Sequence, residues 1–95
     1  MFKEQLSFTP KSIYIDLNFE DVKEELKNKY SNLQDLGGLV ITQSNDYVIT
    51  INKIGKVVIL YNHLPDIELY ELVRQIEQSF RTTVDTFSLE KSIIN

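Results

Sequence analysis

Three short runs of β-branched and aliphatic residues follow one another in the middle of the chain, and only short turns separate them. Asn45 and Asp46 are typical of the first turn, and Gly55 is free to adopt positive φ in the second. Turns this short join neighbouring antiparallel strands. The sequence therefore predicts an antiparallel meander. Its three strands are residues Leu39–Gln43, Tyr47–Asn52 and 56–61.

A long amphipathic helix is predicted after the meander. Pro65 and Asp66 mark its start, because proline and acidic residues are favoured in the first turn of a helix. Apolar residues then recur at the spacing of one helix face, and polar residues occupy the other face. The inner face consists of Leu69, Leu72, Val73, Ile76 and Phe80. The outer face consists of Glu68, Glu71, Arg74, Glu77 and Gln78.

The part of the chain before the meander predicts one strand and one helix. Residues 12–18 alternate between apolar and polar, as in a half-buried strand. Asn18 is a suitable N-cap for a helix that runs to about Asn32, with Val22, Leu26 and Tyr30 on its inner face. Residues 5–8 and 82–87 alternate more weakly, and we interpret them as edge strands at the two ends.

These elements give an α+β fold in the order β-α-β-β-β-α, with extra edge strands at both ends. The 95 residues form a single domain, residues 1–95. Both helices are expected to pack on one face of one antiparallel sheet, since a face rich in isoleucine and leucine must be covered. The other face of the sheet is then open unless a partner covers it.

Composition excludes several classes of function. The chain has no cysteine, which excludes disulfides and thiolate chemistry, and a single histidine, which excludes sites built from two imidazoles. No apolar run approaches the roughly 20 residues that span a membrane, and no signal peptide is recognisable. The net charge of −4 argues against a nucleic-acid-binding surface. We expect a cytoplasmic protein with no membrane contact.

Alternation along the meander assigns residues to the two faces of the sheet. Ile49 and Ile51 are expected to face the helices, together with Leu39 and Ile41. The third strand is apolar on both sides, so its orientation stays open, but either orientation leaves an apolar patch on the free face. The predicted interaction face is Val40, Thr42, Val48, Thr50, Asn52, Lys56, Val58 and Leu60. Alternatively, a terminal segment or a second subunit simply covers this face.

The stretch from Leu36 to Ile76 resembles one half of a TATA-box-binding protein. Proteins of that family contain two repeats, each with a strand, a helix, a curved antiparallel meander and a long helix. The segment Leu36-Gly-Gly-Leu-Val40 is similar to the family's Phe-Pro-Gly-Leu-Val stretch, and Asn52-Lys-Ile-Gly-Lys-Val-Val58 to its Phe-x-Ser-Gly-Lys turn. The order of elements agrees over about residues 12 to 81. The resemblance implies a half-saddle fold and a role as an accessory factor in transcription.

The departures from the family concern DNA binding. The family's repeats insert phenylalanines into the minor groove, and the matching positions here are Leu36 and Asn52. Basic positions of the family fall on Thr42 and Asp46, whereas Lys56 keeps its charge. Fewer basic contacts weaken the phosphate attraction that dominates DNA affinity. A complete saddle would require a homodimer, because this chain carries one repeat.

Other candidate sites have simpler interpretations. His63 is expected to be a loop or capping residue, although Asn62 and Asp66 lie near it in sequence. The pairs Glu24–Glu25 and Glu68/Glu71, and the cluster Lys23/Lys27/Lys29, are typical of solvated helix faces. Gly37 and Gly38 precede a strand, so they indicate a bend and not a phosphate loop. Tyr14, Tyr47 and Tyr61 are interpreted as rim or core residues; the alternative is a platform for stacked bases.

The sequence therefore predicts a non-enzymatic interaction module. It would bind a protein partner or a second copy of itself through the free sheet face, with no catalytic residue, metal, cofactor or small-molecule substrate. One alternative is DNA or other nucleic-acid binding by a homodimer that rebuilds the two-repeat saddle. A second alternative is an enzyme or ligand-binding protein centred on His63.

Overall fold

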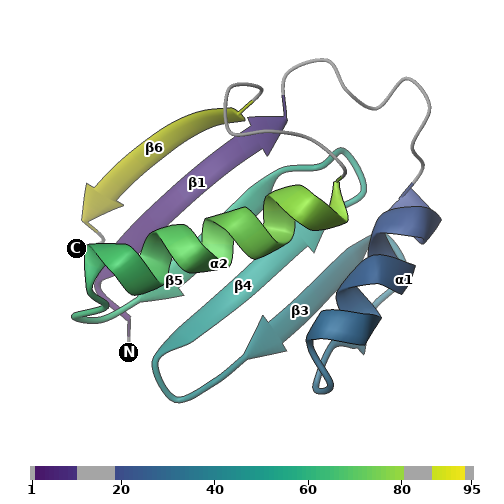
Figure 1. Ribbon diagram of the computed structural model, residues 1–95, viewed down its shortest axis with the longest axis horizontal. Helices are drawn as coiled ribbons and strands as arrows, with labels where there is room; N and C mark the ends of the chain where they lie inside the picture. The colour runs from purple at the N-terminus through teal and green to yellow at the C-terminus, as the bar shows by residue number, and fades with distance from the viewer. Residues whose placement is uncertain (1, 11–18, 81–86, 94–95) are drawn as a thin grey trace.

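The computed structural model describes residues 2–10, 19–80 and 87–93. It contains an antiparallel sheet with the strand order β2-β3-β4-β5-β1-β6 and two helices, which confirms the α+β class (Figure 1). The elements are β1 (Glu4–Pro10), α1 (Phe19–Lys29), β2 (Gln34–Asp35), β3 (Leu39–Gln43), β4 (Tyr47–Asn52), β5 (Val57–Tyr61), α2 (Asp66–Ser79) and β6 (Phe87–Ile93).

The predicted meander is confirmed. Strands β3 and β4 have the predicted bounds, and β5 begins one residue later than predicted. Gly55 has a φ of 91°, and its N–H donates to the carbonyl of Asn52 across the tight turn. Gly37 has a φ of 89° in the bend before β3, a conformation that glycine adopts without the steric cost of a Cβ atom. The turn residues therefore set the meander locally.

Both predicted helices are present, and their inner faces are buried. The five predicted apolar residues of the second helix are all buried, the last of them, Phe80, as the C-cap of α2. In α1 Val22 and Leu26 are buried, followed by Tyr30 just past the helix end. The first helix ends at Lys29, earlier than predicted, and the Asn32 side chain lies beyond its end and turns toward the sheet. It donates to the Gln43 carbonyl and accepts a hydrogen bond from the Thr42 hydroxyl.

One residue of the predicted outer face of α2 is wrongly placed. Glu77 is buried, whereas Glu68, Glu71, Arg74 and Gln78 are exposed as predicted. Glu77 lies four residues after Val73 on the helix, so it flanks the buried stripe. Helical spacing alone does not reveal that this flank is buried.

The terminal strands differ from the predictions in position. The predicted strand at residues 5–8 is present as β1, but it lies between β5 and β6 and is not an edge strand. The edge strand at the C-terminal side is β6, which begins where the predicted segment 82–87 ends. Residues 82–86 lie outside the described residues, as do the predicted strand 12–18 and the predicted cap Asn18.

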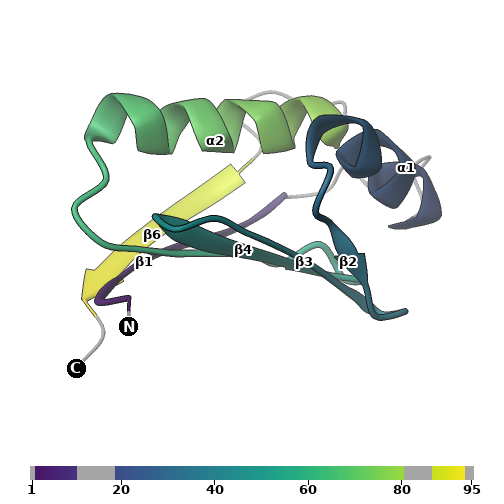
Figure 2. The ribbon, with the colours of Figure 1, turned by 90° about the horizontal axis from the view of Figure 1, so that it is seen from below.

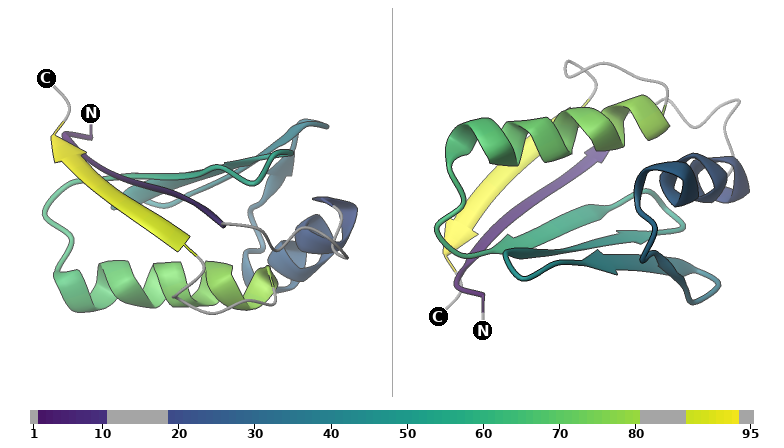
Figure 3. Two further views of the ribbon diagram at one scale, coloured as in Figure 1. Left: turned by 90° about the horizontal axis from the view of Figure 1, so that it is seen from above. Right: turned by 60° about the horizontal axis from the view of Figure 1, so that its bottom comes forward.

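Both helices cover the same face of the sheet, as predicted (Figure 2). They bury one continuous core that includes Leu6 and Phe8 of β1, Ile49 of β4, Ile59 of β5 and Leu69 of α2. No described element packs on the opposite face, and the two views in Figure 3 agree on this arrangement. We call this opposite surface the open face.

Candidate interaction surface

Strand register fixes which residues form the open face. Ile49 and Ile51 face the core, as predicted, and they pair with Ile59 and Val57 of β5. Residues directly opposite in an antiparallel pair lie on the same face of the sheet. The buried side of β5 is therefore Val57, Ile59 and Tyr61, and Val58 and Leu60 belong to the open face. This resolves the orientation that the sequence leaves open.

The predicted orientation of β3 is wrong. Val40 and Thr42 are only 1% and 4% exposed on the core face, whereas Leu39 and Ile41 are half-buried on the open face. The register pairs Val40 with Ile51 and Thr42 with Ile49, which places both on the covered side. Two of the eight predicted interaction residues, Val40 and Thr42, are thus core residues.

The reason for this error is the composition of the strand. Both sides of β3 carry a branched apolar residue, so alternation of hydrophobicity does not distinguish them. Thr42 is tolerated in the core because its hydroxyl donates to Asn32 Oδ1 at 2.6 Å. The register with β4 would have revealed the orientation, since the β4 assignment was already correct.

The open face combines aliphatic and neutral polar side chains. One cross-strand row consists of Ile41, Thr50, Val58 and Ser7, and the next consists of Gln43, Val48, Leu60 and Gln5. The aliphatic members of these rows are half-buried by their neighbours in the sheet. Across β3, β4, β5 and β1 neither row contains a charged residue, and on β6 the first row continues with Glu90 and the second with Ser92.

Two predicted interaction residues lie at the end of this surface. Asn52 pairs with Leu39, and its Oδ1 accepts hydrogen bonds from the N–H groups of Ile54 and Lys56. Its side chain therefore closes the β4–β5 turn. Lys56 is exposed immediately before β5, so its ammonium group borders the open face.

A buried lysine was missed by the sequence interpretation. Lys23 is part of the predicted solvated cluster, but its side chain is only 8% exposed. Its Nζ lies 2.5 Å from Glu20 Oε2 and 3.2 Å from Asp35 Oδ1, and it also donates to the Gly37 carbonyl. The Phe19 ring centroid is 5.2 Å away. Lys23 therefore ties α1 to the loop before β3. Lys27 and Lys29 are exposed, as predicted.

The ionisation of this cluster follows from its contacts. The hydrogen bond from the Gly37 N–H, with a second from Lys23, holds the pKa of Asp35 below its usual value. The hydrogen bond to Glu20 raises the pKa of Lys23 and outweighs the lowering caused by burial. The acceptors of the buried Lys23 ammonium all lie within the cluster, which therefore stabilises the docking of α1.

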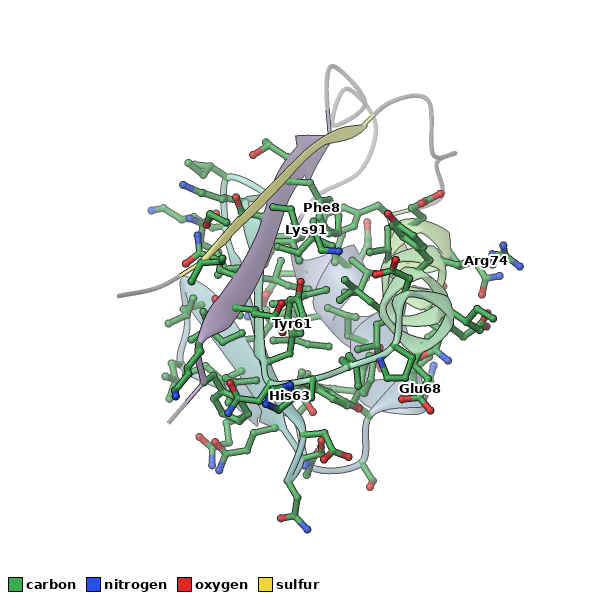
Figure 4. The ribbon with its side chains drawn as sticks, turned by 90° about the vertical axis from the view of Figure 1, so that its left-hand side faces the viewer. Phe8, Tyr61, His63, Glu68, Arg74 and Lys91 are labelled. Carbon is green, nitrogen blue, oxygen red and sulfur yellow. The ribbon has the colours of Figure 1, made fainter. Side chains whose placement is uncertain are left out.

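The two buried tyrosines lie on the covered side of the sheet. The Tyr30 hydroxyl donates to Gln75 Oε1 at 3.0 Å, and burial raises its pKa to about 12. Tyr61 lies between the sheet and α2, and among the described residues its hydroxyl has no hydrogen-bond partner (Figure 4). Burial also raises the pKa of Tyr61.

The position of the tyrosines argues against base stacking on the open face. Tyr47 pairs with Tyr61 and shares the core face with it, as the core interpretation predicted. Tyr14 lies outside the described residues.

The remaining candidates do not assemble into a reactive site. His63 is exposed in the loop before α2, with a φ of 53°, and its N–H donates to Glu4 Oε2 (Figure 4). Glu24, Glu68 and Glu71 are exposed on helix surfaces, and Glu25 is half-buried. Within residues 2–10, 19–80 and 87–93, no three histidine or acidic side chains are grouped to hold a metal ion. In the same residues, no helix is long and apolar enough to cross a membrane.

Comparison of the chain with protein-family models, with curated proteins and with solved structures found no match. The candidate site is therefore defined by its own geometry.

Proposed function

We propose that this chain is a non-enzymatic module that binds another protein, or a second copy of itself, through the open face. The observation that supports this proposal is the half-exposed aliphatic surface of Leu39, Ile41, Val48, Val58 and Leu60, which no described element covers. Apolar area removed from water contributes roughly 25 cal/mol per Å². A partner that covers this surface would therefore gain affinity mainly from the hydrophobic effect.

The polar residues of the open face indicate what kind of partner would fit. Gln5, Gln43 and Thr50 provide neutral hydrogen-bonding groups between the aliphatic side chains. A partner with an apolar, uncharged contact surface matches this pattern, because a charge buried over β3, β4, β5 and β1 would find no counter-ion in the rows. The neutral polar groups would set the register of the complex.

The half-saddle fold of the TATA-box-binding family is part of the same proposal. It is supported by the order of elements, since a strand and a helix precede the meander and a long helix follows it. A role as an accessory factor in transcription rests on the resemblance of the sequence motifs alone.

The alternative of DNA binding is less well supported. A homodimer that rebuilt the saddle would present the two rows of the open face to the duplex, and these rows carry no lysine or arginine. Lys56 borders them, but a minor-groove protein gains most of its affinity from several phosphate contacts. A salt-dependent shift of an A/T-rich duplex by the purified chain would favour this alternative over the protein partner.

The test of the proposed function is a charge placed in the middle of the open face. We expect Leu60→Glu to abolish binding, because a carboxylate would be buried against an apolar partner. Asn28→Glu, on the exposed side of α1, is the matched control. The mass of each variant is measured by light scattering, and partners from the source cell are captured on each immobilised variant.

A partner, or a dimer mass, that is present with the wild type and Asn28→Glu but absent with Leu60→Glu supports the proposal. Equal mass and equal capture for all three proteins would reject the open face as the binding surface. Circular dichroism and urea denaturation confirm that Leu60→Glu is folded.

A further inference from the structure

Four of the large apolar side chains that remain exposed fall into two pairs. Leu36 and Ile54 are 59% and 69% exposed, and Ile67 and Tyr70 are 85% and 48% exposed. Neither pair belongs to the rows of the open face. Large exposed apolar residues that cluster at a surface are typical of interaction sites. Charged residues accompany each pair, and their balance indicates the partner.

The first pair lies at the loop tips of the sheet. Leu36 is in the loop between β2 and β3, and Ile54 is in the turn between β4 and β5. The two loops are joined, because the Lys53 N–H donates to the Gly38 carbonyl at 2.9 Å. We call Leu36, Lys53, Ile54 and Lys56 the tip patch.

The tip patch carries unpaired positive charge. Lys53 and Lys56 are both exposed, and neither forms an ion pair within the part of the chain that the structure describes. Lys23 and Lys27 interact with Asp35, and Lys91 interacts with Asp66. The tip therefore presents two free ammonium groups on a chain whose net charge is −4.

The second pair lies on the first two turns of α2. Ile67, Tyr70 and Glu71 share one face of the helix at spacings of three and four, and Glu68 lies beside Glu71. All four are exposed, and we call them the helix patch. Arg74 follows three residues after Glu71 on the same side of the helix and is also exposed, so two carboxylates and one guanidinium leave this stretch with a net negative charge.

The two patches complement each other. Each contains two exposed apolar side chains, and the tip patch adds two lysines whereas the helix patch adds two glutamates, with one arginine a turn away. They lie at opposite ends of the molecule, since α2 starts at the end of the sheet opposite to the β2–β3 and β4–β5 loops (Figure 2). We propose that copies of this chain associate head to tail, with the tip patch of one copy docked on the helix patch of the next.

This mode of association follows from the charges and from the positions of the patches. Two copies with a net charge of −4 repel each other on average, so the basic tip is attracted specifically to an acidic region of its neighbour. Unlike patches at opposite ends form a heterologous interface, which extends into open chains unless the rotation closes a ring. The open face remains free in such a chain.

The interface is small and partly electrostatic, so the association is weak. Exposed charges are screened over about 8 Å at physiological salt, and we therefore expect the mass to fall as salt is added. Sedimentation velocity at low ionic strength, up to a chain concentration of about 1 mM, should show a weight-average mass that rises above the monomer value of 11.1 kDa.

Two single variants provide the decisive measurement. Ile54→Glu places an acid in the tip patch and leaves the helix patch intact, and Ile67→Lys places a base in the helix patch and leaves the tip patch intact. Each variant alone should stay at the monomer mass. An equimolar mixture should reach twice that mass and no more, because the intact tip of one variant binds the intact helix of the other.

The charge itself is tested by a second set of variants. Lys53→Glu with Lys56→Glu should abolish the association, and the further changes Glu68→Lys and Glu71→Lys in the same chain should restore it. These four positions are exposed, so the variants are expected to fold, which circular dichroism checks.

Leu60→Glu separates this inference from the proposed function. It should associate head to tail as the wild type does, because Leu60 belongs to the open face. A wild-type mass that is constant with concentration would overturn the inference. It would also be overturned by a mixture of Ile54→Glu and Ile67→Lys that stays monomeric, or by association that is lost only in Leu60→Glu.

Discussion

The two faces of the sheet consist of the same strands but obey different constraints. On β5, Ile59 is fully buried under the helices, and its neighbour Leu60 is half-exposed on the open face. Packing under the helices dictates the size and shape of Ile59. Nothing described in the fold dictates Leu60. An aliphatic residue there is therefore more informative about binding than one in the core.

Polar groups show the same contrast. On the covered side, Thr42, Tyr30 and Lys23 have hydrogen-bond partners in Asn32, Gln75 and Asp35. Buried polar groups need such partners, because an unpaired group loses its hydration without compensation. On the open face Gln5, Gln43 and Thr50 keep contact with solvent, and Ser7 is the one polar residue of the two rows that is buried.

The largest expected difference between the faces concerns core volume. Ile59→Ala should lower the free energy of unfolding by about 2–5 kcal/mol, since it leaves a cavity under the helices. Leu60→Ala, the adjacent residue on the open face, should lower it by about 1 kcal/mol or less. Urea denaturation of both variants measures the difference. Similar losses at the two positions would contradict the division of the sheet into a packed face and an open face.

A smaller effect is expected from the two buried tyrosines. Tyr30→Phe should destabilise the protein by about 1 kcal/mol, because Gln75 loses its hydrogen-bond partner. Tyr61→Phe should be neutral or stabilising by up to about 1 kcal/mol, since its hydroxyl has no partner among the described residues. Thermal and urea denaturation compare the pair. A clear destabilisation by Tyr61→Phe would show that its hydroxyl is satisfied.

The smallest expected effect is the pH dependence of protein stability that comes from the cluster of Glu20, Lys23 and Asp35. The pKa of Asp35 is lower in the folded protein than its ordinary value of 3.8. The folded state thus favours the charged form, so this stabilisation is present at neutral pH and is lost as the pH falls through the folded pKa. Asp35→Asn should be less stable than the wild type at pH 7.

The difference in stability between Asp35→Asn and the wild type should shrink as the pH is lowered below about 4. Asp46→Asn, in the exposed turn between β3 and β4, is the control for the loss of a carboxylate. Urea denaturation at several pH values provides the data. If the stability difference between Asp35→Asn and the wild type stayed constant as the pH was lowered, the role of the charged Asp35 would be contradicted.

Most local elements could be predicted, because their signals lie within a few residues. The turn at Gly55 and the helix start at Pro65 agree with the structure. The placement of four residues failed for a common reason. Val40 and Thr42 were assigned to the open face, and Glu77 and Lys23 to solvent, although neighbouring elements bury all four. Burial of this kind depends on residues that are distant in the sequence.

The candidate surface was predicted only in part. Val48, Thr50, Val58 and Leu60 lie on the open face, as predicted for the interaction surface. Leu39 and Ile41 were missed, because an isolated strand that is apolar on both sides gives no indication of its orientation. The signal that could have placed them was the pairing with β4.

By itself, the sequence determined the meander, the amphipathic helices and a sheet with both described helices on one face. These follow from periodicities of two and 3.6 residues and from turn chemistry, which act over short stretches of chain. Only the tertiary structure decided which side of β3 faces the core and that β1 lies inside the sheet. It also decided that Lys23 is buried against Asp35. The physical reason is that strand register and helix docking join residues far apart in the chain, and these contacts determine which side chains lose water.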